Sequence, residues 1–180
     1  ALAEIGARYE LIDGDDTTHK EALARWDAEY GSQYDKAEML RHVGKYVDQV
    51  RAALDSLPHS VLLLEQRMDT GIPGVWGTGD AVVVSPEAIH VLDLKYGRGV
   101  PVDAAGNPQL RLYGLGALRC FGDLLGDVET ISMSIIQPRL GSFSTEKLPV
   151  RELEAWREGV VMPAVERIAQ GSMDASPSEG

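Results

Sequence analysis

Two apolar runs separated by one turn constrain the fold of this chain more than any other feature. Residues 77–84 (GTGDAVVV) and 88–96 (AIHVLDLKY) each have the composition of a β-strand, and the "SPE" between them predicts a hairpin. With Pro86 and Glu87 at the centre of the turn, both faces of this hairpin are largely apolar. We therefore expect helices to cover the sheet on both sides.

Other hydrophobic periodicities predict the element order helix, three strands, helix, strand, helix. The result is an α/β fold with a mixed central sheet of about four strands flanked by helices. Asn107 and Pro108 predict a helix start, as N-cap and first-turn residue. The expected elements are a helix over 36–54, strands in "VLLLEQRM" at 61–68, 77–84 and 88–96, a helix from 107 to about 121, a strand in "TISMSIIQP" at 130–138, and a helix over 150–169 that bends at Pro163 and buries Leu153, Trp156, Val160 and Ile168.

The length of 180 residues suits one structural domain with a sizeable core. We expect residues 1–59 to form a helical part, itself beginning with a short helix over 1–9, that packs on a core formed by 60–170. Residues 171–180 (GSMDASPSEG) have the composition of a flexible tail. The longest apolar runs fall far short of a membrane span, so we expect a soluble protein without a membrane partner.

The net charge of −11 argues against the broad basic surface of a general nucleic-acid coat. Contact with DNA would have to be local, and the stretch 93–119 around the candidate site has a positive balance, four basic against two acidic side chains. A single cysteine, Cys120, excludes an internal disulfide or a cysteine-built metal site and fits a reducing cytoplasm. The four histidines lack zinc-ligand spacing, and His42 is better explained as a packed or surface residue than as a ligand.

The candidate chemistry lies where the hairpin opens. In the expected register Asp80 lies opposite Asp93, and Lys95 follows on the same face. Two like charges across a strand pair destabilise a sheet, and Mg²⁺ would offset them because it binds one or two carboxylates and leaves positions for water and phosphate. Lys95 would orient or deprotonate the attacking water, or neutralise charge on the phosphate oxygens. The alternative is a solvated strand end whose ion pair contributes less than about 1 kcal/mol.

The wider pattern favours the chemical interpretation. "GTGD" at 77–80, "DLK" at 93–95 and "QLRLY" at 109–113 have the order and spacing of the motifs of RecB-like exonucleases in the PD-(D/E)XK nuclease superfamily, which this chain resembles over about 60–140. "QPR" at 137–139 is similar to a phage- and prophage-encoded branch of that family. The resemblance implies a restriction-endonuclease-like core of order α-β-β-β-α-β.

The resemblance also implies roles for individual residues. Asp80, Asp93 and Lys95 correspond to the catalytic set, in which the two acids and the backbone carbonyl of Leu94 bind Mg²⁺ or Mn²⁺. Glu65 resembles a further metal-binding acid of some members, with a solvated strand-end glutamate as the alternative. The expected DNA-binding residues are Gln109 and Tyr113, four apart on one helix face, together with Arg98 and Arg111.

The function implied is a metal-dependent deoxyribonuclease, favoured as an exonuclease, in DNA recombination, repair or replication in the bacterial cytoplasm, of phage or prophage origin. Its partners would be DNA and a phage single-strand annealing or replication protein. The alternative is a DNA-end or protein-binding module that has kept the fold with weak catalysis.

Many members of the RecB-like family carry an H-x-x-x-E helix before the core, and here Glu4 stands at the acid position. Relatives often bind an iron–sulfur cluster through later cysteines, and we expect none in this chain. Strand polarity, strand preference and oligomeric state are left open.

Overall fold

The computed structural model describes residues 35–125 and 128–171, together with the single positions 24 and 28. The described elements are α3 (Lys36–Ser56), β1 (Val61–Ile72), β2 (Val75–Val84), β3 (Ala88–Leu94), α4 (Pro108–Leu125), β4 (Thr130–Gln137), β5 (Ser142–Pro149), α5 (Val150–Trp156), the π-helical turn η1 (Arg157–Val161) and α6 (Met162–Ala169). The expected helix over 1–9, Glu4 and residues 172–180 lie outside the described part. No described helix is long and apolar enough to cross a membrane.

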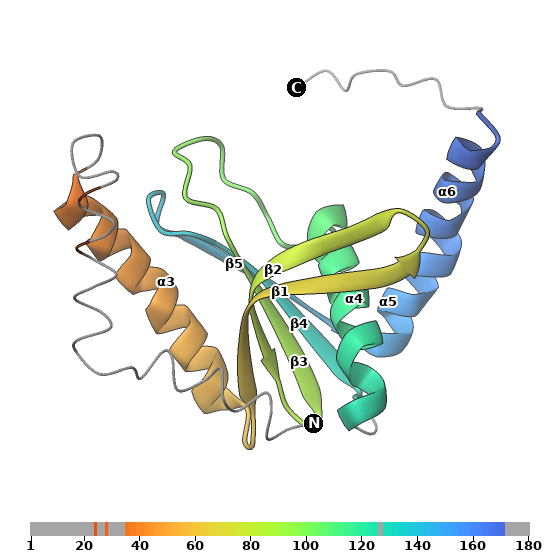
Figure 1. The fold of residues 1–180 in the computed structure, drawn as a ribbon, viewed down its shortest axis with the longest axis horizontal. Helices are drawn as coiled ribbons and strands as arrows, with labels where there is room; N and C mark the ends of the chain where they lie inside the picture. The colour runs from red at the N-terminus through yellow and green to blue at the C-terminus, as the bar shows by residue number, and fades with distance from the viewer. Residues whose placement is uncertain (1–23, 25–27, 29–34, 126–127, 172–180) are drawn as a thin grey trace.

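One mixed sheet in the order β1-β2-β3-β4-β5 organises these elements (Figure 1). Strands β3 and β4 are parallel and are joined through α4, whereas the other neighbours are antiparallel. Helix α3 packs on one face, and α4 and α5 pack on the other. The expected α/β architecture, with a mixed sheet covered on both faces, is confirmed.

The sheet has one strand more than the sequence predicts, because β5 lies between the expected strand at 130–138 and the expected helix at 150–169. Residues 142–149 (SFSTEKLP) alternate between half-buried and exposed side chains. Their inward positions include Ser144 and Glu146, so the alternation has almost no hydrophobic signal. A polar edge strand with an exposed lysine, here Lys147, is a common way to protect a sheet edge from pairing with another chain.

The β2–β3 hairpin has the register that the sequence predicts. Ala81 pairs with Leu92 and Val84 with Ile89, and the turn is closed by the Ser85 amide, which donates to the Ala88 carbonyl at 2.9 Å. Because side chains alternate along the strands, the sheet has a hydrophobic core on each face. The core between the sheet and helices α4 and α5 includes Val82, Val91, Ile131 and Leu153. The core between the sheet and α3 includes Val50, Ala81, Val83 and Leu92.

Helix α4 begins as expected, since the Asn107 side chain accepts a hydrogen bond from the Leu110 amide at 3.0 Å. It runs four residues beyond the expected end. Gly114 and Gly116 let it lie directly on the sheet: a Cβ at Gly114 would stand 2.8 Å from the Met133 sulfur, and one at Gly116 would stand 2.8 Å from the Met68 Cβ. The close approach that these glycines allow outweighs their cost to the helix of about 1 kcal/mol each.

The last helical segment differs from the expectation. The bend occurs in η1, directly before Met162 and Pro163, because proline lacks the amide that would continue the α-helical hydrogen bonding. Of this last helical segment, only α5 reaches the core. Leu153 is fully buried and Trp156 packs against the core, but Val160 and Ile168 are more than half exposed, so their expected burial is wrong.

Strands β1 and β2 change face at Glu65 and Asp80. Strict alternation would send Leu63 and Met68 of β1 to opposite faces, yet both belong to the α4-side core. The change is located at Glu65, whose φ of 49° is left-handed. Beyond it, residues 66–79 form a two-stranded projection, here called the β1–β2 arm, that bends across α4 (Figure 1).

A partly buried polar network crosses the α3 side of the sheet. His90 Nε2 lies 2.7 Å from Ser134 Oγ, which lies 2.7 Å from Thr145 Oγ1. Burial, with a smaller contribution from the Lys147 charge, lowers the pKa of His90 to about 4. His90 is therefore neutral in the folded protein near neutral pH.

This lowered pKa predicts a pH-dependent stability. Unfolded His90 would titrate near 6.5, so its contribution is fully present above that pH and is lost as the pH falls from 6.5 toward 4, by about 3 kcal/mol in all. Urea unfolding at several pH values should show this loss in the wild type and less of it in His90→Gln. The control His59→Asn, at an exposed histidine, should keep the wild-type slope. An unchanged slope in His90→Gln would contradict the assignment.

Candidate functional site

Asp80 and Asp93 lie at the open end of the β2–β3 hairpin, on the α4 side of the sheet. Asp80 Oδ2 accepts a hydrogen bond of 2.6 Å from the Leu94 amide, which ties the end of β3 to β2. Burial raises the pKa of Asp80, and the charges of Asp93 and Glu65 raise it further, while the Leu94 amide and Lys95 oppose the rise. The two carboxylates therefore repel each other at a partly desolvated position.

Asp93 is buried, with 5% of its surface exposed. The Lys95 ammonium lies 3.0 Å from Asp93 Oδ2, but this ion pair lacks hydrogen-bond geometry, and the buried oxygen has no hydrogen-bond partner within the described residues. Lys95 thus supplies one positive charge beside two carboxylates, and the pair Asp80 and Asp93 fits a divalent metal ion.

Lys95 begins a polar chain that leads onto α4. Its Nζ lies 3.4 Å from Gln109 Oε1, and Gln109 Nε2 donates to the Tyr113 hydroxyl at 2.9 Å. The Tyr113 ring lies on Gly77 of β2, where an added Cβ would stand 2.3 Å from the ring carbon Cε1. The structure therefore brings together Asp80, Asp93, Lys95, Gln109 and Tyr113. Gly77, the first residue of the "GTGD" motif, leaves room for the Tyr113 ring and so positions that side chain.

Glu65 lies near this group without completing a ligand cluster. Its charge raises the pKa of Asp80, yet no group of three or more His, Cys, Asp and Glu side chains in 35–125 and 128–171 is arranged to hold a metal ion. Its role as a ligand stays a prediction, as does that of the Leu94 carbonyl. The left-handed backbone of Glu65 is a strained position of the kind that gathers at functional sites.

Tyr46 of α3 is a neighbour of the acids that the sequence did not single out. Its hydroxyl lies 3.4 Å from the Leu92 carbonyl oxygen. Burial raises its pKa well above the ordinary range, and Asp80, Asp93 and Glu65 add to the rise in that order. The hydroxyl consequently stays protonated and can donate a hydrogen bond.

The two arginines expected to contact DNA lie in ion pairs within the protein. Arg98 pairs with Glu38 of α3, and Arg111 forms a bidentate pair with Glu146 of β5, with bonds of 2.8 and 2.6 Å. The Arg111–Glu146 pair ties α4 to the edge strand. The contact of Arg98 and Arg111 with DNA stays a prediction.

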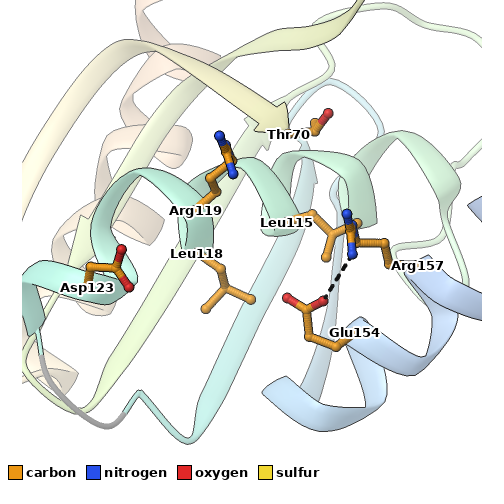
Figure 2. Close-up of a pocket in the computed structure, with 7 residues that line it drawn as sticks. All are labelled: Thr70, Leu115, Leu118, Arg119, Asp123, Glu154 and Arg157. Atoms are coloured by element: carbon orange, nitrogen blue, oxygen red, sulfur yellow. Dashed lines mark ion pairs between the residues drawn. The ribbon is translucent and has the colours of Figure 1, made fainter. Parts of the chain in front are cut away.

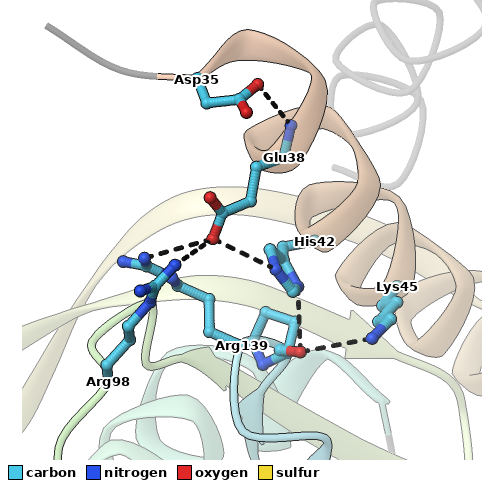
Figure 3. Close-up of polar contacts among 7 residues, drawn as sticks. Asp35, Glu38, His42, Lys45, Arg98 and Arg139 are labelled. Carbon is cyan, nitrogen blue, oxygen red and sulfur yellow. Dashed lines mark hydrogen bonds and ion pairs between the residues drawn. The ribbon is translucent and has the colours of Figure 1, made fainter.

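Glu38 is the centre of a polar cluster that ties α3 to the site loops (Figure 3). Besides Arg98 it pairs with Arg139 at 3.3 Å, and His42 Nε2 lies 3.8 Å away. His42 Nδ1 lies 3.0 Å from the Pro138 carbonyl oxygen. His42 therefore packs within this cluster. In the sequence, the contact between Glu38 and His42 is indicated by their spacing of four residues, which places both side chains on one face of the helix.

The "QPR" segment supports the loop that follows Lys95. Gln137 is buried, its Oε1 accepts from the Val102 amide at 2.6 Å, and its Nε2 donates to the Val100 carbonyl at 3.3 Å. The guanidinium carbon of Arg139 lies 5.1 Å from the Tyr96 ring centroid. The motif thus holds the loop in place and has no contact with the carboxylates in the described structure.

The described part of the chain is an α/β protein in which two acids, a lysine and a glutamine–tyrosine pair meet where a hairpin opens against a helix. Residues 1–180 match the model of a family described as "Protein of unknown function (DUF2800)". The chain belongs to that family.

Gly77→Ala should lower the free energy of unfolding by about 1–3 kcal/mol, because the new methyl group collides with the Tyr113 ring. Gly44→Ala in α3 is the matched control. A Cβ there meets nothing within 4 Å, and alanine should stabilise the helix by up to about 1 kcal/mol. Urea unfolding measures both. A Gly77→Ala protein as stable as the wild type would contradict the close packing of Tyr113.

Proposed function

We propose that this chain is a metal-dependent DNA nuclease of the RecB-like type, with a PD-(D/E)XK core, that acts from DNA ends. The observation that carries the proposal is the buried Asp93 carboxylate beside a second, partly desolvated acid, Asp80, with Lys95 3.0 Å from Asp93. One lysine charge beside two acids leaves a net negative charge, which favours a divalent cation at this position.

Asp80 and Asp93 would hold Mg²⁺ or Mn²⁺, with the Leu94 carbonyl as the proposed further ligand. The metal would supply an activated water and charge neutralisation at the phosphate. Lys95 is held between Asp93 and Gln109. From there its ammonium can donate to a phosphate oxygen as charge develops, or orient the attacking water.

Gln109 and Tyr113 would hold the DNA strand beside the carboxylates. Their mutual hydrogen bond and the packing of Tyr113 on Gly77 restrict both side chains in advance of binding, which lowers the ordering cost when substrate arrives. The proposed setting is phage or prophage recombination, repair or replication in the bacterial cytoplasm. A phage single-strand annealing or replication protein is the proposed partner.

Metal binding can be tested without catalysis. At 100 times its Kd, Mn²⁺ should stabilise the protein by about 2.7 kcal/mol and raise Tm by about 5–10 °C. Asp93→Asn and Asp80→Asn should each abolish most of this shift. Asp123→Asn, at an exposed acid on α4, should keep it. Equal shifts in all four proteins would exclude the carboxylate pair as the metal site.

Cleavage can be tested on end-labelled linear and closed-circular DNA with Mg²⁺, Mn²⁺ or EDTA. Metal-dependent loss of the linear form alone is expected, and Lys95→Ala should reduce the rate at least about 100-fold, as expected for a group acting on the reacting phosphate. Lys147→Ala removes the same charge at an exposed position on β5 and should cleave normally. A folded, metal-binding protein that cleaves neither substrate would instead support a binding module on the same fold.

A further inference from the structure

The β1–β2 arm carries an exposed tryptophan beside a cation. Trp76 is 58% exposed, and the guanidinium carbon of Arg67 lies 4.2 Å from its ring centroid. Trp76 pairs across the arm with Asp69, and Arg67 pairs with Thr78. The indole is not buried within the described structure, so core packing does not explain a tryptophan at this position. The neighbouring arginine holds the ring in a defined orientation.

A hollow of about 410 Å³ lies beside Trp76, lined by Arg67, Asp69, Arg119 and the arm tip at 71–75. Two cationic side chains therefore face one acid, and Asp69 already accepts a hydrogen bond of 2.9 Å from the Gly71 amide. Within the described residues neither arginine has an acidic partner. The hollow is locally positive in a chain whose net charge is −11.

A second hollow, of about 480 Å³, lies between the arm, α4 and α5 (Figure 2). It shares Arg119 but adds Asp123, Glu154 and Arg157, and Arg157 is itself 4.0 Å from Glu154. Its charges balance, so it does not suit a phosphate. An anionic strand would therefore be favoured on the Trp76 side of the arm.

The strand that carries Trp76 also carries Asp80, although Trp76 is exposed on the face of the arm opposite to Gly77 and Tyr113. Trp76 and Asp80 lie four residues apart on β2, which is about 13 Å along the strand, a few nucleotides of DNA. We propose that Trp76 and Arg67 form a stacking site for a base of single-stranded DNA and that Arg67 and Arg119 contact its phosphates. This inference rests on the proposed function for its ligand.

The charge of the protein favours a single strand over a duplex. Duplex binding depends on neutralising many phosphates, and a chain with a net charge of −11 lacks the broad basic surface for it. Stacking on an aromatic ring is independent of charge and of base identity. With two phosphate contacts, log K for a single strand should fall with log salt at a slope of only about −1.4.

The test measures binding of a fluorescein-labelled 20-nucleotide oligothymidylate in EDTA, where no cleavage occurs. Trp76→Ala should weaken binding roughly 5- to 100-fold, the effect of losing one base stack, and Trp76→Phe should recover most of it. Phe143→Ala removes another exposed aromatic ring, 46% exposed on β5, and should bind as the wild type does. Arg67→Gln should weaken binding and flatten the salt dependence.

The outcomes separate this inference from the nuclease proposal. Unchanged binding by Trp76→Ala, or equal affinity of the wild type for a blunt duplex, would overturn the stacking site even if metal-dependent cleavage is found. Binding that depends on Trp76, without cleavage by the wild type under any metal, would support the stacking site and refute the nuclease. A wild-type protein that does not bind the oligonucleotide would also overturn the inference.

Discussion

The change of face at Glu65 and Asp80 is the constraint on which the rest of the site depends. Without it, β1 and β2 would continue the plane of the sheet, and the outer half of each strand would present the wrong side chains to α4. With it, Met68 and Gly77 turn onto α4, and the strained residue lies among the acids. The backbone distortion and the carboxylate pair therefore occur at the same place. At the bend β2 leaves β3, and Asp80 and Asp93 lie where these two strands part.

Electrostatics at this point favour a cation. Burial and the neighbouring acids raise the pKa of Asp80, and Lys95, 3.0 Å from Asp93, supplies one positive charge beside two acids. The Leu94 amide and the Gln109 side chain have hydrogen-bond partners within the described structure. Two acids beside one lysine at a partly desolvated position are typical of functional sites.

Helix α3 and the "QPR" segment form the supporting layer behind the site. Glu38 joins Arg98 and Arg139, and Gln137 holds the loop after Lys95 through two backbone contacts. Arg98 lies in the least acidic stretch of the sequence, and an acid 60 residues earlier in the chain pairs with it. Local charge balance is a poor guide to such pairs because long-range contacts supply the partners.

The sequence by itself determined the hairpin register, the start of α4 and the grouping of Asp80, Asp93 and Lys95 on one face, because strand alternation and capping are local rules. Only the tertiary structure decided the edge strand β5, whose inward residues are polar, and the bend at Glu65, which no residue type signals. It also decided that Tyr113 lies on Gly77 and that Trp76 stays exposed. These features depend on which surfaces meet across the sheet, and packing of that kind is not encoded in any short segment.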